Sequence, residues 1–155
     1  MGSAINLTEL IGRGGVFTDV EGTTPQEVYQ HLSSLMKFPD YICRNEFVDA
    51  LCQREQVLST AVGNGIAMPH PQTPMVKDAQ EQSISVCYLK RSIDMKAPDG
   101  MRVYVMFVLM TSNVQDHLQI ISHLAKTLHR PEVKKCLERR AGLEELLKTI
   151  SEQNI

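Results

Sequence analysis

The sequence predicts an α/β or α+β sandwich, a single domain in which helices surround a few strands. Its 155 residues are enough for one globular domain, and 43% of them are hydrophobic, as a core requires. One apolar run, 103–110, is bounded by polar residues, as expected of a central strand covered on both faces. Stretches with apolar residues at helical spacing lie before and after that run.

The first half of the chain carries signals for three helices and one strand. Asn6 is the expected N-cap of a short helix, with Glu9 three residues later. Thr24 is a stronger N-cap, because Pro25 follows it at the first helical position. The expected elements are a helix from Asn6 that ends at Gly14-Gly15, a strand over 16–20, a helix from 25 that ends near Pro39, and a helix over 45–55.

The second half predicts strands followed by helices. Residues 83–90 alternate between two faces, which predicts a strand with a buried face. The turn Pro98-Asp99-Gly100 makes 93–103 a candidate hairpin that leads into the apolar run. Three further helices are expected: one over 114–128, one that begins at Pro131, and one that buries apolar residues over 143–150.

Composition excludes several classes of function. A formal net charge of −2 gives no reason to expect nucleic acid or an anionic membrane as a partner. The longest apolar run, eight residues, is too short to span a bilayer, and the N-terminus lacks a basic segment followed by an apolar one. We therefore expect a cytoplasmic protein without direct membrane insertion. Widely spaced cysteines predict reduced, mostly buried thiols: Cys43, Cys52, Cys87 and Cys136.

The most informative stretch is Arg54–Pro71, in which a Gly-Asn-Gly turn precedes a histidine between two prolines. The glycines allow a sharp turn or a close approach of backbone amides to a ligand. Pro69 and Pro71 restrict the backbone on either side of His70. The position of His70 is therefore unusually well determined, as a reactive imidazole requires.

These residue types suit a nucleophile that accepts a phosphoryl group. Neutral imidazole is a good nucleophile near pH 7, and a phosphorus–nitrogen bond keeps the group transferable. Arg54 could present its planar fork to phosphate oxygens. Neutral donors could come from the hydroxyl of Thr60 or from the amides of the turn, formed by Gly63, Asn64 and Gly65.

Rival chemistries have weaker support. The turn lacks the Gly-Lys-Ser/Thr ending of a Walker loop, and His70 and the cysteines lack metal-ligand spacing, so no metal and no cofactor is expected. A hydrolase triad of Ser59, Asp116 and a histidine stays open, although no nucleophile elbow is present. A plain Gly/Pro connection with an incidental histidine also stays open.

The pattern gives the other four histidines structural rather than chemical roles. His31, His123 and His129 lie at predicted helix surfaces. His117 lies on the apolar face of the helix over 114–128, close to the end of the central strand, and the pattern alone favours a core histidine.

A family resemblance changes that interpretation. Arg54-Glu55, Ser59-Thr60 and the run G-N-G-I-A-M-P-H resemble the signature of the enzyme IIA domain of the bacterial sugar phosphotransferase system, in the fructose/mannitol class that includes nitrogen-regulatory proteins. The resemblance covers 4–153 and implies one domain with a mixed β-sheet and helices on both faces. It implies a phosphotransferase that accepts a phosphoryl group on His70 from phospho-HPr or its nitrogen-branch counterpart and passes it to an enzyme IIB cysteine.

The resemblance also assigns site roles. His117 matches the family's second histidine, which is implied to orient or stabilise the active imidazole or its phosphoryl group, and Arg54 matches a phosphate-binding arginine. Two features depart from the family pattern. Pro71-Gln72 stands where the family often has glycine and a basic residue, and 111–114 lacks the proline common before the second histidine.

Three uses of this site stay open. The first is a relay of the phosphoryl group from HPr to enzyme IIB. The second is a nitrogen-type signal, in which phosphorylation changes the affinity for a regulatory target protein. The third is a non-catalytic regulatory binding module whose loop is not phosphorylated.

Overall fold

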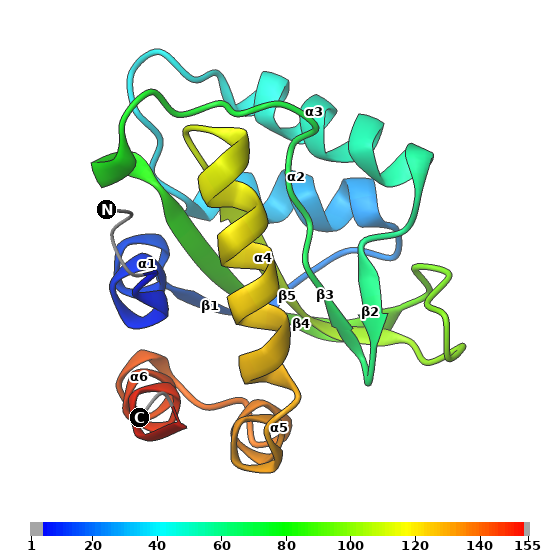
Figure 1. The fold of residues 1–155 in the computed structure, drawn as a ribbon. Helices are drawn as coiled ribbons and strands as arrows, with labels where there is room; N and C mark the ends of the chain where they lie inside the picture. Colours follow the sequence, from blue (N-terminus) through cyan, green and yellow to red (C-terminus); the bar gives the residue numbers. More distant parts are fainter. Residues whose placement is uncertain (1–4, 154–155) are drawn as a thin grey trace.

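The sheet of this protein is built around strand β5 (Figure 1). The structure is a computed structural model that describes residues 5–153, so the predicted domain start, residue 4, lies outside the described residues. In chain order the elements are α1 (Leu7–Gly14), β1 (Val16–Val20), α2 (Pro25–Leu35), α3 (Arg44–Val57), β2 (Ala61–Gly63), β3 (Ile66–Ala67), the 3-10 turn η1 (Ala79–Glu81), β4 (Ser83–Ile93), β5 (Val103–Met110), α4 (Val114–Leu128), α5 (Pro131–Glu138) and α6 (Leu143–Gln153).

The five strands form one mixed sheet in the order β1-β4-β5-β3-β2. Strand β4 pairs antiparallel with β5, and their connection is the predicted hairpin, because Ile93 lies opposite Val103. Strand β1 runs parallel to β4, and β3 runs parallel to β5. Since β3 and β5 run parallel, both end at the same edge of the sheet.

Helices cover both faces of the sheet, as predicted (Figure 1). Along β4, Ile84, Val86 and Tyr88 contribute to one core, whereas Cys87 and Leu89 contribute to the other. The first core includes buried residues of α1, α4, α5 and α6, and the second includes those of α2 and α3. The result is a three-layer α/β domain with a buried sheet.

The predicted helix starts are confirmed by their N-caps. The side chain of Asn6 accepts a hydrogen bond from the backbone of Glu9 at 3.1 Å. Thr24 caps α2 in the same way and Pro25 is the first residue of that helix. Asn113 caps α4, where its side chain accepts from the backbone of an acidic residue in the first turn. These side chains satisfy amides that have no partner within the helix.

Some boundaries differ from the prediction. Helix α2 ends at Leu35 rather than near Pro39, and α3 extends over Arg44–Val57 rather than 45–55. Strand β4 continues to Ile93 because its pairing with β5 continues that far. The sequence did not indicate strands β2 and β3, which are short and flank the Gly-Asn-Gly turn.

The prediction for the cysteines holds in part. Cys87 and Cys136 are buried, Cys52 is half-buried and Cys43 is exposed, so burial extends to two of the four unpaired thiols.

Candidate functional site

His70 follows Met68 and Pro69, two residues after β3 whose backbone groups continue the hydrogen bonding of the sheet. The amide of Met68 donates to the carbonyl of Thr60 at 3.0 Å, and the amide of Leu109 in β5 donates to the carbonyl of Pro69 at 2.9 Å. The two residues before His70 are therefore held between the start of β2 and the central strand. This places His70 at the carboxyl edge of parallel strands, where α/β proteins commonly form sites.

His117 reaches the same edge from the other parallel strand. Strand β5 ends at Met110, a three-residue connection follows, and His117 lies in the first turn of α4. The structure brings the two rings together, with His70 and His117 centroids 4.5 Å apart and planes inclined by 59°. The two histidines, 47 positions apart in the sequence, form a single site.

The hydrogen bonding of His70 fixes which nitrogen is free. Its Nδ1 lies 2.9 Å from the carbonyl oxygen of Met68. A carbonyl only accepts, so Nδ1 carries the proton in the neutral ring and Nε2 keeps its lone pair. Burial lowers the pKa of His70, and the charge of Arg54 acts in the same direction, whereas the Met68 bond and Glu55 oppose them. The ring is therefore neutral near pH 7, with a nucleophilic Nε2.

His117 is neutral as well. Burial is the main cause that lowers its pKa to about 4, and the neighbouring His70 and the positive charge of Arg54 add to that effect. Neither ring must lose a proton before it can act at neutral pH.

The end of α3 brings a cation to this pair. Arg54 lies in the last turn of α3, and its Nη1 donates to the carbonyl of Leu58 at 2.6 Å. Its charge lowers the pKa of both His70 and His117. The structure thus places the predicted arginine within electrostatic reach of both histidines.

Glu55, which sequence reasoning did not assign to the site, fastens α3 to β2. Its carboxylate accepts from the backbone amide of Thr60 at 3.0 Å and from the Thr60 hydroxyl at 2.6 Å. Tyr29 also donates to it at 3.3 Å. The Thr60 hydroxyl proton is therefore already bound by Glu55, and Thr60 holds the site together rather than offering a free donor. The acidic partner of the Arg-Glu pair was the signal for this contact.

The Gly-Asn-Gly turn lies at the opposite end of β3 from His70. Gly65 and His70 are five positions apart, which is about 16 Å of extended chain. The Asn64 amide donates to Asp99 at 2.8 Å, and residues of the turn line a small cavity with the end of α4, beside His129. Contrary to the expectation from their closeness in sequence, Gly63, Asn64 and Gly65 are not brought to His70. The turn lies at one end of β3 and His70 lies beyond the other end.

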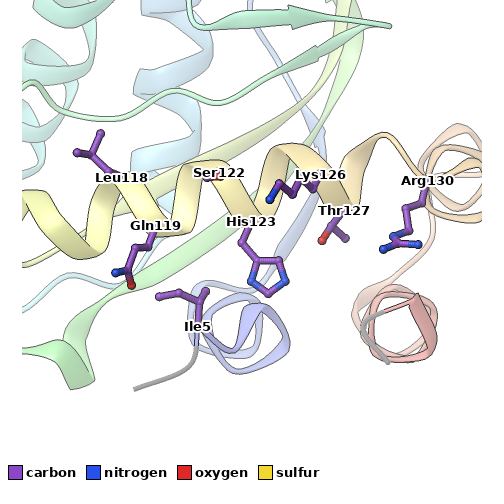
Figure 2. A pocket seen from close by; sticks show the side chains of 8 residues that line it. All are labelled: Ile5, Leu118, Gln119, Ser122, His123, Lys126, Thr127 and Arg130. Atoms are coloured by element: carbon purple, nitrogen blue, oxygen red, sulfur yellow. The ribbon is translucent and has the colours of Figure 1, made fainter. Parts of the chain in front are cut away.

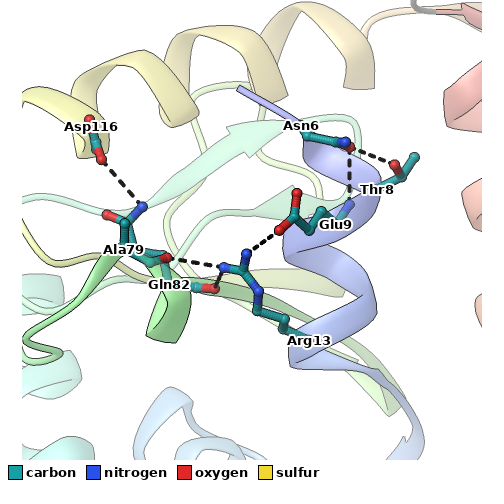
Figure 3. A network of polar contacts seen from close by, with 7 residues as sticks. All are labelled: Asn6, Thr8, Glu9, Arg13, Ala79, Gln82 and Asp116. Atoms are coloured by element: carbon teal, nitrogen blue, oxygen red, sulfur yellow. Dashed lines mark hydrogen bonds and ion pairs between the residues drawn. The ribbon is translucent and has the colours of Figure 1, made fainter. Parts of the chain in front are cut away.

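A buried glutamine, also missed from the sequence, supports the start of α4. The Gln82 side chain accepts from the amide and hydroxyl of Ser112 at 3.0 and 3.1 Å and donates to Asp116 at 3.3 Å. Arg13 donates to the Gln82 carbonyl at 2.8 Å (Figure 3). These contacts link α1 to the connection between β5 and α4 and to the first turn of α4, where His117 lies. Nothing in the local sequence indicated them, since the partners of Gln82 lie some 30 positions or more away.

A groove along α4 lies away from this site. It has a volume of about 620 Å³ and runs along α4, where the ring of His123 lies beside Ile5 (Figure 2). It contains none of Arg54, His70 and His117. The chemistry of the histidine pair, rather than the size of a cavity, identifies the candidate site.

No helix within 5–153 has the length and apolar character needed to cross a membrane.

Comparison with known proteins gives consistent results. A nitrogen regulatory protein of Pseudomonas aeruginosa is 27% identical over 150 residues, covering 94% of this chain and 95% of that protein. The fructose-specific EIIABC component of the Bacillus subtilis phosphotransferase system is 26% identical over 136 residues, 86% of this chain and 21% of that longer protein.

Solved structures share the fold. The nitrogen regulatory protein IIA-Ntr from Neisseria meningitidis matches with a TM-score of 0.76 at 21% identity, covering 92% of this chain and 97% of that one. The enzyme IIAMTL in its complex with phosphorylated IIBMTL from Escherichia coli matches with a TM-score of 0.69 at 18% identity, covering 90% and 95%. A family model extends the match over 9–153, and the chain belongs to the family described as phosphoenolpyruvate-dependent sugar phosphotransferase system, EIIA 2.

Proposed function

We propose that this phosphotransferase-system component is a phosphocarrier that accepts a phosphoryl group on Nε2 of His70 from phospho-HPr or a nitrogen-branch HPr. The observation that carries the proposal is the hydrogen bond from His70 Nδ1 to the Met68 carbonyl, which leaves Nε2 unprotonated beside His117. A neutral imidazole with a fixed tautomer needs no separate base to become a nucleophile.

The step balances without a proton transfer at His70. The Nε2 lone pair forms the new N–P bond while the N–P bond of the carrier's phosphohistidine breaks. The electron pair of the broken bond stays on the carrier's ring nitrogen, and that ring leaves as neutral imidazole with its proton on the other nitrogen. His70 retains its Nδ1 proton, so the phosphorylated ring is a cation that donates to Met68.

Arg54 and His117 stabilise the transferred group in this proposal. One contact, to the carbonyl of Leu58, engages the Arg54 guanidinium among the described residues, so several of its five N–H donors can reach phosphoryl oxygens. His117 provides a neutral polar group beside the acceptor ring. Phosphoryl transfer depends mainly on such positioning and charge stabilisation.

An apolar rim gives the carrier a surface to dock on. It consists of Val57 and Leu58 after Arg54, and of Val114 and Leu118 on either side of His117, and each is 62–70% exposed. A modest apolar patch with a polar centre is typical of protein interfaces. We therefore place the docking site of HPr around the histidine pair.

The phosphoryl group then passes to a cysteine of an enzyme IIB. A thiolate attacks phosphorus, the S–P bond forms as the N–P bond breaks, and the electron pair returns to Nε2 of His70. The complex of enzyme IIAMTL with phosphorylated IIBMTL supports this class of partner.

Similarity to nitrogen regulatory proteins favours a second use of the same adduct, as a signal to a target protein. A dianion beside the apolar rim would weaken an apolar contact through its charge alone. A IIB partner retained from cell extract, and phosphorylated by the protein, supports transport. A complex formed only by the unphosphorylated protein supports regulation.

Intact mass after incubation with phosphoenolpyruvate, enzyme I and HPr tests the acceptor. The wild type should gain one acid-labile phosphoryl unit and His70→Ala should gain none. His123→Ala is the matched control, because it removes a histidine from α4 outside the pair and should still be phosphorylated. A wild type that stays unmodified, with carriers that phosphorylate another enzyme IIA, would leave a non-catalytic binding module.

A further inference from the structure

The tautomer of His117 matters as much as that of His70. Thr111 Oγ1 lies 3.3 Å from Nδ1 of His117, and either atom can be the donor, depending on where the imidazole proton is. Thr111 is 5% exposed and follows the last residue of β5. Within 5–153, His117 is the hydrogen-bond partner of the Thr111 hydroxyl.

Burial decides between the two assignments. If Nδ1 of His117 donated to the hydroxyl oxygen, the proton of the buried Thr111 hydroxyl would have no acceptor among the described residues. If the hydroxyl donates to Nδ1, both groups are satisfied and the imidazole proton is on Nε2. Buried polar groups in folded proteins almost always have a hydrogen-bond partner.

We propose that Thr111 is a positioning residue that keeps His117 in the Nε2–H tautomer, so that His117 presents an N–H donor to the phosphoryl group on His70. The inference rests on the proposed function for its phosphoryl group, but not for the tautomer. The two rings of the site then have opposite assignments, since His70 carries its proton on Nδ1 and His117 on Nε2.

The opposite assignments complement each other chemically. The acceptor ring offers a lone pair to phosphorus, while the second ring offers a hydrogen-bond donor to the oxygens. In the other tautomer, the Nε2 lone pair of His117 would face the negatively charged oxygens of the phosphoryl group. Donors aimed at developing negative charge are a main source of catalysis in transfer reactions.

The surrounding contacts hold Thr111 and His117 in register. Met110 pairs with Ser83 across the sheet, which fixes the residue before Thr111. Ser112, the residue after it, is held by Gln82, and the amide of His117 donates to the carbonyl of Asn113 at 3.1 Å. The hydroxyl and the ring are therefore anchored by separate elements.

Thr111→Val and Thr111→Ser form a matched pair for the test. Valine has the shape of threonine without the hydroxyl, whereas serine keeps the hydroxyl and loses a methyl group. Long-range ¹H–¹⁵N NMR of the unphosphorylated proteins above pH 6 assigns the tautomer of His117, which needs no carrier protein. Nε2–H should dominate in the wild type and in Thr111→Ser, while Thr111→Val should show both tautomers.

Kinetics provide the second readout. The rate of phosphoryl acceptance from HPr should fall by about tenfold in Thr111→Val, less than for loss of a complete donor, and should be largely kept in Thr111→Ser. Thr111 acts through His117, so Thr111→Val in a His117→Ala background should cause no further loss.

Three results would overturn the proposal: an Nδ1–H tautomer in the wild type, an unchanged tautomer in Thr111→Val, or additive losses in the double variant. If the predicted tautomer is present and the wild type accepts no phosphoryl group, the proposed function fails while the role of Thr111 in setting the tautomer stands. A Thr111→Val protein that does not fold leaves the wild-type and Thr111→Ser spectra to decide.

Discussion

The two ends of strand β3 differ in what their polar groups do. At the carboxyl end, His70 and His117 are neutral, close together and only partly used, with one ring nitrogen each outside the contacts described. At the other end, the Asn64 amide is satisfied by Asp99, and Asn64 and Gly65 have φ angles of 58° and 80°. Positive φ at both positions is what a two-residue hairpin turn requires.

The comparison shows that closeness in a motif is not closeness in space. The turn and the histidine belong to one continuous signature, yet the strand between them holds them apart. The glycines serve the hairpin, and the hairpin places β3 beside β5 so that His70 meets His117. The histidine end should therefore control the rate of transfer, and the turn end should control stability.

The largest expected effect is at the histidine end. His117→Ala should lower the rate of phosphoryl acceptance by about 10²–10³-fold, the usual result of removing one donor to developing negative charge. His117→Gln, whose amide can still donate, should recover part of the rate. Quenched time courses of phosphorylation, with phospho-HPr in excess, measure the rate for both variants. A His117→Ala protein with the wild-type rate would remove His117 from the site.

A substitution at the turn end should lower the stability of the protein rather than the rate of transfer. An alanine Cβ at Gly65 would lie 2.5 Å from Cδ1 of Tyr104, and φ is already positive there, so Gly65→Ala should cost about 1–3 kcal/mol of unfolding free energy. Gly100→Ala is the matched control, because φ is +74° there and no atom lies within 4 Å of the added Cβ. Urea unfolding should show the larger loss for Gly65→Ala.

The rate of phosphoryl acceptance per folded molecule separates the two ends further. Gly65→Ala should leave it at the wild-type value, because the turn lies about a strand's length from His70. A loss comparable with that of His117→Ala would mean that the amides of the turn reach the phosphoryl group after all.

The elements that the sequence predicted well are those with local signals. Helix caps such as Thr24 with Pro25, and the apolar run of β5, depend on neighbouring residues, and the structure confirms them. Strands β2 and β3 have three and two residues, too short for an alternating pattern. They exist because β5 pairs with β3, and β3 in turn pairs with β2. Their position could not be predicted without the sheet.

The site shows the same division. His70 could be proposed as a site residue from its prolines and from the resemblance, while proposing His117 needed the resemblance, since a histidine on an apolar helix face looks like a core residue. Glu55 contacts Thr60 only five positions away, and the acidic residue beside Arg54 was its signal. Gln82 contacts Ser112, 30 positions away, because the connections before β4 and α4 pack together, and such long-range packing leaves no local sequence signal.

The smallest predicted effect is a change in the pKa of His117 when His70 is phosphorylated. Burial, His70 and Arg54 hold that pKa at about 4 in the unmodified protein. The dianion adds an opposite charge that favours imidazolium, so the pKa should rise toward the ordinary value of about 6.5. NMR titration of the His117 ring measures this, while the amide signals of Asn64 and Gly65 should remain unchanged. An unchanged pKa would place the phosphoryl group away from His117, and shifted turn amides would contradict the separation of the two ends.

The low pKa of His117 also makes stability depend on pH. As pH falls from about 6.5 toward 4, His117 binds a proton in the unfolded chain but stays neutral in the folded protein, so the unmodified protein loses stability in that range. The phosphorylated protein should lose less, because the pKa of folded His117 is then closer to that of the unfolded chain.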